Sequence, residues 1–352
     1  MNGLLLMNLG TPDAPTTGAV RAYLREFLSD PRVLDIHPVI RAGLLYGVIL
    51  PFRPAKSAAA YAKVWMPEGS PLRVHSEALT KRVSDALGGR WRVALGMRYG
   101  QPAMGDALDS LVQAGVARIV VFPMYPQYAT SSTGSMLEAL YQQAGRYEVP
   151  PRLRVVTDFF DDPRFLEPSA AAVQSRVNAL QPDHVLFSFH GLPERQIRRA
   201  SPDTERCRMS GDCCDRIDAG NRHCYRAQSH HTARAIAGSV GLSSDAWSIS
   251  FQSRLGRAPW IKPWTDEMIP ALATGGVKRL LVSCPSFTSD CLETLEEIGI
   301  RARESFLAAG GEALDLVPCL NDDASWAEGV AAMAAELVHT EASSSAIVSL
   351  EE

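Results

Sequence analysis

The sequence predicts an α/β protein built from two Rossmann-like, doubly wound parallel-sheet domains that are related by an internal repeat. Three pairs of segments match in the same order along the chain: 4–12 with 185–193, 91–100 with 247–256, and 115–123 with 276–285. In the second pair, WRVALGMRYG and WSISFQSRLG carry Trp, Arg and Gly at the same offsets. This ordered self-similarity indicates two copies of one design.

Short apolar runs alternate with amphipathic segments through both copies. The apolar runs predict strands at 3–9, 92–97, 117–123, 152–157, 184–189, 247–252, 278–283 and 313–317. Helical patterns occupy 71–87, 103–114, 133–144, 164–179, 266–274, 288–308 and 323–338, and a further helix begins near Ala227. Because the strands are continuously apolar and separated by helices, we expect parallel sheets that are covered on both faces.

Length and composition agree with two soluble domains. A chain of 352 residues can bury two cores, and 46% hydrophobic with 21% charged residues is typical of a globular protein. The net charge of −4 gives no reason to expect nucleic acid as a partner. No glycine-rich phosphate-binding motif follows a predicted strand, so no nucleotide cofactor is expected.

The N-terminal residues MNGLLLMN lack the charged start and cleavage site of a signal peptide, which favours a cytoplasmic protein. The most apolar candidate for a surface segment is 38–52, which Arg41 interrupts. It is shorter than the roughly 20 residues that cross a bilayer. Two interpretations remain for this segment: a helix of the core, or a helix that dips into a membrane surface.

Polar residues follow several predicted strands. His190 comes directly after the strand at 184–189, and the loop 285–290 follows the strand at 278–283. Residues 125–128 and 8–13 hold the same position in the first copy. Ligands of doubly wound sheets bind beyond the carboxyl ends of the strands, so we expect these four segments to face a shared cleft.

His190 and a row of carboxylates are the candidates for chemistry. A histidine at a strand end can be structural, but a neutral imidazole there can also accept a proton near neutral pH. Asp290, Glu293 and Glu297 are spaced to share one face of a helix that starts near Thr288. The alternative for this face is a solvated acidic surface, which is also the expectation for Glu296.

Five long motifs resemble those of ferrochelatases: MNLGTPDAPTTGAVRAYLREFLSDPRV (7–33), YPQYATSSTGS (125–135), SFHGLPERQ (188–196), SFQSRLGRAPWIKPWTDE (250–267) and CPSFTSDCLETLEEI (284–298). The resemblance extends over about residues 3–335 in order. It implies a chelatase-like fold of two Rossmann-like domains around a porphyrin cleft. It also implies that Fe(II) and protoporphyrin IX are the substrates and that protohaem is the product.

The resemblance divides the chain into two domains. It assigns 1–150 to the first domain, with an apolar lip at about 31–70, and we expect a C-terminal helix at 320–340 to complete this domain. The second domain, 151–319, carries His190, a cysteine-rich insertion at 207–224 and the acidic helix at 288–308. The lip corresponds to the segment around 38–52, so the resemblance favours peripheral contact with the inner face of the membrane.

The resemblance also implies roles for individual residues. His190 and Glu293 match the family's catalytic pair: a porphyrin must lose two inner N–H protons as the metal enters, which requires a base. We expect His190 to be that base, with ligation of the metal as the alternative, and Asp290 and Glu297 to form a path for metal or protons with Glu293. The residues matched to the porphyrin walls are Trp260, Tyr125, Gln127, Tyr128, Ser132 and Thr133, with Arg53 and Tyr61 for the propionates.

Four cysteines lie in the insertion that replaces a short family loop: Cys207, Cys213, Cys214 and Cys224. Some ferrochelatases carry a [2Fe–2S] cluster, and four closely spaced thiols suit such a site. Zinc, free thiols and disulfides are the alternatives, although seven cysteines in a cytoplasmic chain do not suggest disulfides. Cys284, Cys291 and Cys319 are expected to be packing residues.

Other activities and assemblies stay open at this point. Coproporphyrin III could replace protoporphyrin IX, another chelatase could insert cobalt into a different tetrapyrrole, and a non-catalytic haem or iron sensor could keep the same fold. The chain could act as a monomer or as a homodimer.

Overall fold

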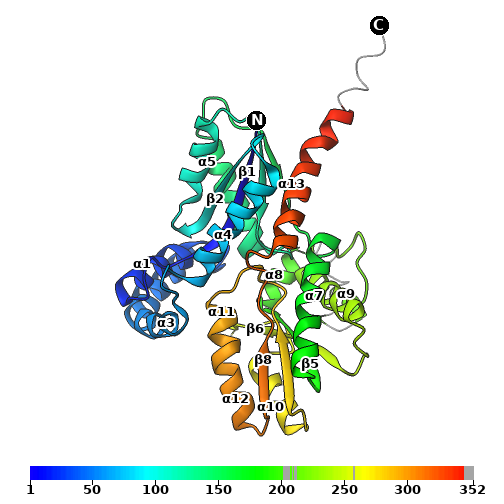
Figure 1. Cartoon of the computed structure of the whole chain (residues 1–352). Coiled ribbons are helices and arrows are strands. Elements are labelled where there is room, and N and C mark those ends of the chain that lie inside the picture. Colours follow the sequence, from blue (N-terminus) through cyan, green and yellow to red (C-terminus); the bar gives the residue numbers. More distant parts are fainter. Residues whose placement is uncertain (201–206, 208, 210–211, 257, 345–352) are drawn as a thin grey trace.

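Two four-stranded parallel sheets form the centre of the computed structural model, in which residues 1–200, 207, 209, 212–256 and 258–344 are described (Figure 1). The first sheet has the order β2-β1-β3-β4 and the second has the order β6-β5-β7-β8. The two orders are equivalent, as the internal repeat predicts. The strands are β1 (Asn2–Thr11), β2 (Trp91–Gly100), β3 (Arg118–Pro123), β4 (Leu153–Val155), β5 (His184–His190), β6 (Trp247–Gln252), β7 (Arg279–Ser283) and β8 (Ala313–Leu316). All eight predicted strands are therefore confirmed.

Helices cover both faces of the first sheet. Leu4 and Leu6 of β1 face a cluster that includes Trp326 and Val330, whereas Leu5 faces the opposite side. The first face is covered by α4 (Pro71–Leu87) and α13 (Ala324–Ser344), and the second by α5 (Met104–Gln113) and α6 (Ser135–Ala144). Figure 1 shows α13, in red, beside the first sheet although it comes last in the chain. Successive side chains of a strand point to opposite faces of the sheet, so a strand that is covered on both faces needs an apolar residue at every position.

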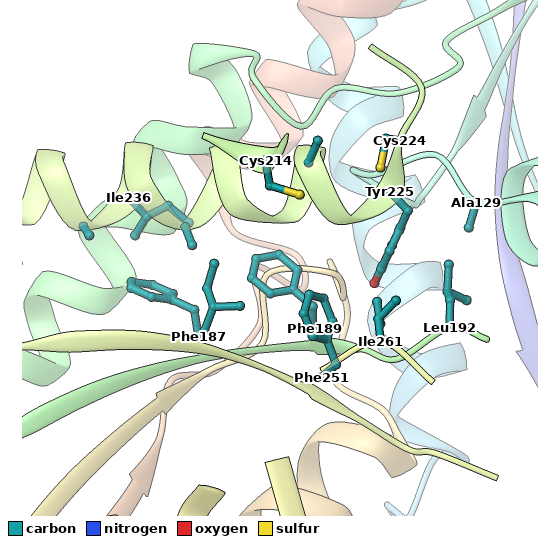
Figure 2. Close-up of a cluster of buried hydrophobic side chains, with 14 of the residues drawn as sticks. Ala129, Phe187, Phe189, Leu192, Cys214, Cys224, Tyr225, Ile236, Phe251 and Ile261 are labelled. Atoms are coloured by element: carbon teal, nitrogen blue, oxygen red, sulfur yellow. The ribbon is translucent and has the colours of Figure 1, made fainter. Parts of the chain in front are cut away.

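The second sheet is covered in the same way. Phe187 and Phe189 of β5 point toward α7 (Pro163–Leu180) and α9 (Tyr225–Val240), as Figure 2 shows for α9. Leu186, directly before Phe187 in sequence, packs on the other face with Ile269 and Phe306. That face is covered by α10 (Thr265–Thr274) and α12 (Arg303–Ala308).

A helical segment projects from the first half between β1 and α4. It consists of α1 (Thr17–Ser29), α2 (Pro38–Leu44), a π-helical stretch at Leu45–Ile49 and α3 (Leu50–Val64), drawn in blue in Figure 1. Residues 38–52 do not form a core helix, because most of their large apolar side chains are exposed. No described helix combines the length and the apolar character that a membrane span requires.

The acidic segment differs from the predicted single helix at 288–308. It is divided into α11 (Leu292–Leu295), a π-helical stretch at Glu297–Ala302 and α12. Cys291 is the N-cap of α11 and has an extended backbone, while the Thr294 side chain accepts from the Cys291 amide. The helix therefore begins four residues later than predicted. π-helical insertions are often found at functional sites.

Candidate functional site

His190 is the last residue of β5 and lies partly buried at the carboxyl edge of the second sheet. Its Nδ1 atom is 2.6 Å from the carbonyl oxygen of Gly191. A carbonyl oxygen can only accept, so Nδ1 carries the proton and donates this bond. In the neutral form of the ring, this bond leaves Nε2 as the nitrogen that can accept a proton.

The backbone around His190 is held by three side-chain and main-chain contacts. The His190 amide donates to the Ser286 hydroxyl (3.0 Å), and the His190 carbonyl accepts from the Tyr225 hydroxyl (2.8 Å). The next amide, that of Gly191, donates to the carbonyl of Gln252 (2.8 Å). These bonds determine the direction in which the imidazole leaves the sheet.

Gln252, at the end of β6, connects this strand edge to the acidic segment. Its Nε2 donates to the carbonyl of Glu293 (2.8 Å), and its Oε1 accepts from the Ser188 hydroxyl (2.7 Å). Gln252 is buried, so both bonds are shielded from water. The position of the Glu293 backbone relative to β5 therefore depends on Gln252.

Glu297 is a partly buried carboxylate held by one residue. The amide and the hydroxyl of Ser253 donate to its two oxygens, at 2.9 and 2.6 Å. Burial raises the pKa of Glu297, and the Glu293 carboxylate raises it further, whereas Ser253, Arg301 and His190 oppose the shift. Ser253 has a φ of 65°, which is uncommon for a residue other than glycine. Glu297 therefore lies within electrostatic range of both Glu293 and His190.

Glu293 lies where the two halves of the molecule meet. Burial raises the pKa of Tyr61 on α3, and the Glu293 carboxylate raises it further. The pKa of Tyr23 on α1 is also raised, first by burial, then by Tyr61 and by Glu293. The effect of Glu293 on both phenols shows that its carboxylate lies close to α1 and α3.

Asp290 does not share a helix face with Glu293 and Glu297, so that prediction was wrong. Asp290 precedes α11, and its carboxylate accepts from the Thr294 hydroxyl (2.9 Å), the Asn321 side chain (2.8 Å) and the Cys319 amide (3.3 Å). The residue is 5% exposed. Its contacts join the loop after β7 to the loop after β8.

Glu296 is buried, not solvated as its position in the sequence suggested. Its side chain is 5% exposed and accepts from Arg301 Nε at 2.7 Å. Its other oxygen lies 3.4 Å from the ammonium of Lys63, on α3. Glu296 therefore connects the acidic segment to the helix that carries Tyr61.

Trp260 lies next to the strand end that carries His190. A Cβ atom placed on Gly191 would be 3.3 Å from Trp260 Cε3, and the indole nitrogen donates to the carbonyl of Leu255 (3.0 Å). Pro193 and Trp260 also form a short antiparallel bridge. The indole is thus fixed beside His190, as the prediction of a ring next to the macrocycle requires.

The predicted wall residues in the first half fall into two groups. Gln127 and Thr133 are almost completely buried, and Gln127 donates to Thr232 (3.2 Å) and to the carbonyl of Pro285 (3.4 Å). Tyr125, Tyr128 and Ser132 are partly buried. Gln127 therefore joins the two halves, while the partly buried group can contact a ligand.

Arg53 and Tyr61 lie on the same helix, α3, but in different surroundings. Arg53 is exposed and Tyr61 is buried near Glu293. A hollow of about 480 Å³ opens on the first-half side of this region, with Thr11, Tyr23 and Tyr46 in its lining. Neither His190 nor Glu293 lines it. Tyr23 lines the hollow, and Glu293 is among the groups that raise the pKa of its phenol.

The four cysteines of the insertion belong to, or pack against, the apolar cluster beneath α9. Cys207, Cys214 and Cys224 are buried in the cluster with Phe189, and Figure 2 shows two of these thiols above the phenylalanines. The sulfur of Cys213 lies 3.9 Å from that of Cys214. Burial raises the pKa of Cys214 to about 12, which the Arg226 guanidinium opposes. Most of the insertion between Cys207 and Cys213 lies outside the described residues.

The described residues hold no ready-made metal site: no three His, Cys, Asp or Glu side chains are arranged to bind an ion together. This applies to the acidic residues around His190 as well as to the four cysteines of the insertion. Cys284, Cys291 and Cys319 are buried or partly buried, as expected. Burial raises the pKa of all three thiols, and Asp290 raises those of Cys284 and Cys319 further.

Several residues of this site were missed by the sequence predictions. Gln252, Ser253 and Ser286 stand inside the long motifs, but only their contacts reveal what they hold. Tyr225 follows the cysteine insertion and Tyr23 lies in α1, which was not among the predicted helices. A pattern of single residues contains no signal for such contacts, because the partners are between 35 and 96 positions apart.

Comparison with known proteins gives a consistent result. A family model described as ferrochelatase matches residues 1–338. The ferrochelatase of Coxiella burnetii (strain CbuG_Q212) is 46% identical over 332 residues, which cover 94% of this chain and 92% of the relative. That of Azotobacter vinelandii is 47% identical over 336 residues, covering 94% and 97%. That of Legionella pneumophila (strain Corby) is 43% identical over 328 residues, covering 93% and 97%.

Among solved structures, SirB from Bacillus subtilis with Fe3+ has a TM-score of 0.51 and 10% identity, with 97% of both chains covered. At that identity the likeness concerns the fold alone.

Proposed function

The chain belongs to the ferrochelatase family and inserts Fe(II) into a porphyrin in haem synthesis, and we propose that His190 accepts the pyrrole protons of that reaction. The observation that supports this role is the bond from His190 Nδ1 to the Gly191 carbonyl, which in the neutral ring makes Nε2 the proton acceptor. An imidazole has a pKa close to neutral pH, so it can take up a proton and release it again.

Glu293 and Glu297 form the proposed path for metal or protons next to His190. The pKa of Glu297 is raised by burial and by Glu293, a perturbation that is common at functional sites, and Ser253 keeps its carboxylate in place. Glu293 acts electrostatically on both Glu297 and the phenol of Tyr61, so we propose that it guides the incoming Fe(II). Asp290 is not part of the proposed path, because its oxygens already accept three hydrogen bonds.

Trp260 and the partly buried group Tyr125, Tyr128 and Ser132 are proposed to contact the porphyrin ring. Aromatic side chains on both sides of a flat macrocycle can favour a distorted ring, which is differential binding of the state that accepts the metal. Arg53, exposed on α3, is proposed to bind a propionate. We propose protoporphyrin IX as the porphyrin, since the apolar side chains of α2 and α3 suit a hydrophobic substrate better than the more acidic coproporphyrin III.

Iron insertion by purified variants tests these roles. His190→Ala should lower kcat by about 100-fold or more, the size of effect that general-base catalysis supplies. The matched control is His339→Ala, which removes an exposed histidine of α13 and should leave kcat unchanged. Wild-type activity in His190→Ala would exclude the role as base.

Assays with protoporphyrin IX, coproporphyrin III and Co(II) compare the proposed substrates directly. Loss of insertion in the His190 variant also excludes a pure sensor.

The insertion is proposed to hold a [2Fe–2S] cluster through Cys207, Cys213, Cys214 and Cys224. Three of these cysteines are buried in one apolar cluster, the sulfur of Cys213 lies 3.9 Å from that of Cys214, and Arg226 Nη1 lies 3.1 Å from the Cys214 sulfur, so a cationic side chain is in place to balance thiolate charge. Burial of unpaired thiols raises the pKa of Cys214 and Cys224, and a bound cluster would supply the positive iron that favours the thiolates.

Iron and acid-labile sulfide per chain, measured together with the visible absorption of anaerobically purified protein, test this proposal. Cys213→Ser should abolish the bands, whereas the control Cys319→Ser, outside the insertion, should keep them. Stoichiometric zinc without sulfide would instead identify a zinc site, and a metal-free chain with four titratable thiols would identify free cysteines.

The segment around 38–52 is proposed to rest on the cytoplasmic face of a membrane. Its exposed large apolar side chains are Val39, Ile40, Leu44, Tyr46, Val48 and Phe52. Arg41 and Arg53 lie among them and can bind lipid phosphates. Such contact would be peripheral.

Monomer and homodimer are both compatible with this placement, and sedimentation equilibrium at micromolar concentration distinguishes them.

A further inference from the structure

Strand β5 extends beyond its partner β7, and this leaves the peptide groups of His190 without a backbone partner on that side. Pairing between β5 and β7 ends at Phe187 and Ser283. On the opposite side β6 continues to Gln252, and the Gly191 amide still bonds to it. In a parallel ladder the amide and the carbonyl of one residue face the same neighbour, so those of His190 point to where β7 has ended.

Two side chains replace the missing strand. The Ser286 hydroxyl accepts from the His190 amide (3.0 Å), and the Tyr225 hydroxyl donates to the His190 carbonyl (2.8 Å). The two hydroxyls thus hold the two peptide groups on either side of the His190 Cα, one through its amide and the other through its carbonyl.

The ring of Tyr225 is buried among apolar side chains, so its hydroxyl needs this bond. Tyr225 is 5% exposed, and Figure 2 shows it reaching from α9 toward Leu192 and Ile261. A hydroxyl in such surroundings is unfavourable unless it is hydrogen-bonded. Phenylalanine would fill the same space, and packing alone therefore does not account for a tyrosine here.

We propose that Tyr225 is a positioning residue for His190: its hydroxyl fixes the peptide whose orientation directs the imidazole into the cleft. This inference rests on the proposed role of His190 as the base. Tyr225 acts from α9, and the same helix holds the opposite wall, because Gln228 Oε1 accepts from the Tyr128 amide (2.7 Å) and Thr232 accepts from Gln127 (3.2 Å). Helix α9 therefore aligns the base with the porphyrin wall.

Tyr225→Phe removes only the hydroxyl and is the first test. We expect kcat for iron insertion to fall by about tenfold while KM for the porphyrin stays within about twofold, because a lost positioning contact affects the transition state more than binding. In protein with ¹⁵N-labelled histidine, the His190 signals should change from a single Nδ1–H tautomer to a mixture. The control Tyr147→Phe removes a hydroxyl that bonds Asp109, remote from His190, and should change none of these readouts.

The same assays separate failure of this inference from failure of the proposed base. If His190→Ala keeps wild-type kcat, both fail together. If His190→Ala is inactive but Tyr225→Phe has wild-type kcat and an unchanged tautomer, only the positioning role is overturned. The double variant should be no slower than His190→Ala, since Tyr225 acts through His190. Should Tyr225→Phe fail to fold, Ser286→Ala tests the peptide on the other side of the His190 Cα, with the same expected split between kcat and KM.

Discussion

The ammonium of Lys63 on α3 lies 3.4 Å from Glu296 Oε1, next to the segment that carries Glu293 and Glu297. This ion pair joins the projecting helices of the first half to the acidic segment of the second. Glu296 is 5% exposed on its side chain, while that of Lys63 is 49% exposed. Loss of the buried Glu296 carboxylate should therefore cost more stability than loss of the half-exposed Lys63 ammonium.

We expect Glu296→Gln to lower the free energy of unfolding by about 1–3 kcal/mol, because it removes the charge that both Lys63 and Arg301 contact. Lys63→Met should cost less than about 1 kcal/mol, since the ammonium is half exposed and screened by water. Urea unfolding measures both. Arg73→Met, which breaks an exposed pair with Glu77, is the control and should have no measurable effect. Equal effects of the Lys63 and Glu296 variants would contradict this assignment.

Ser253→Ala should shift the pH dependence of iron insertion. The Ser253 hydroxyl lowers the pKa of Glu297 against the effect of burial, so its removal raises that pKa further. If Glu297 works as a carboxylate, the acidic limb of the kcat profile then moves to higher pH. The matched control is Ser248→Ala at the opposite end of β6, where the hydroxyl contacts His184 instead. An unshifted acidic limb would remove Glu297 from the proposed path.

Asp30 should make stability depend on pH at the acidic end. Burial opposes the ionised form, but hydrogen bonds from the Ser135 hydroxyl (2.5 Å), the Arg32 amide and the Tyr99 hydroxyl lower the pKa of Asp30 below its ordinary value. A carboxyl with a lowered pKa stabilises the fold above its unfolded pKa of about 4, and this contribution is lost as the pH falls through the folded pKa.

The substitution Asp30→Asn tests this linkage. The variant should be less stable than the wild type at pH 7, and the difference should shrink below about pH 4, where the wild type also loses the carboxylate. Chemical unfolding at several pH values gives the comparison. Asp85→Asn, at an exposed position of α4, should follow the wild-type curve throughout. A constant difference from pH 7 to pH 3 would contradict the assignment.

Phe52→Asp should weaken binding to vesicles of phosphatidylcholine with phosphatidylglycerol. Phe52 is 77% exposed, and burial of its ring in the lipid interface contributes about 1.5–3 kcal/mol, or roughly 10- to 100-fold in partitioning. Val149→Asp alters an equally exposed side chain outside this segment and serves as the control. Co-sedimentation measures both. The same loss in both variants, or in neither, would exclude the segment as the membrane-contacting surface.

Patterns close in sequence predicted the fold well. The eight strands, the equivalent order of the two sheets and the covering helices follow from continuous apolar runs such as LLLM in β1 and VLFSF in β5, which suit strands buried on both faces. The exposed 38–52 segment was ambiguous, because an apolar helix can face either a core or a membrane. Only the positions of its neighbours separate the two.

Predictions of where site residues lie were correct for a strand end and wrong where a long-range contact determines the position. His190 was placed correctly at the edge of the second sheet. Asp290 was wrongly assigned to a helix face, because the Cys291 cap delays the start of α11 and Asn321 captures the carboxylate. Glu296 was expected in water, yet it is buried and contacts Lys63, which lies 233 positions away in the sequence.

The sequence by itself determined two repeated parallel sheets, a histidine at the end of β5 and the family to which the chain belongs. Only the tertiary structure decided which hydroxyls hold the two peptide groups on either side of His190. The physical reason is distance along the chain: apolar periodicity lies in neighbouring residues, whereas Ser286 and Tyr225 are 96 and 35 positions from His190 and reach it only in the folded chain.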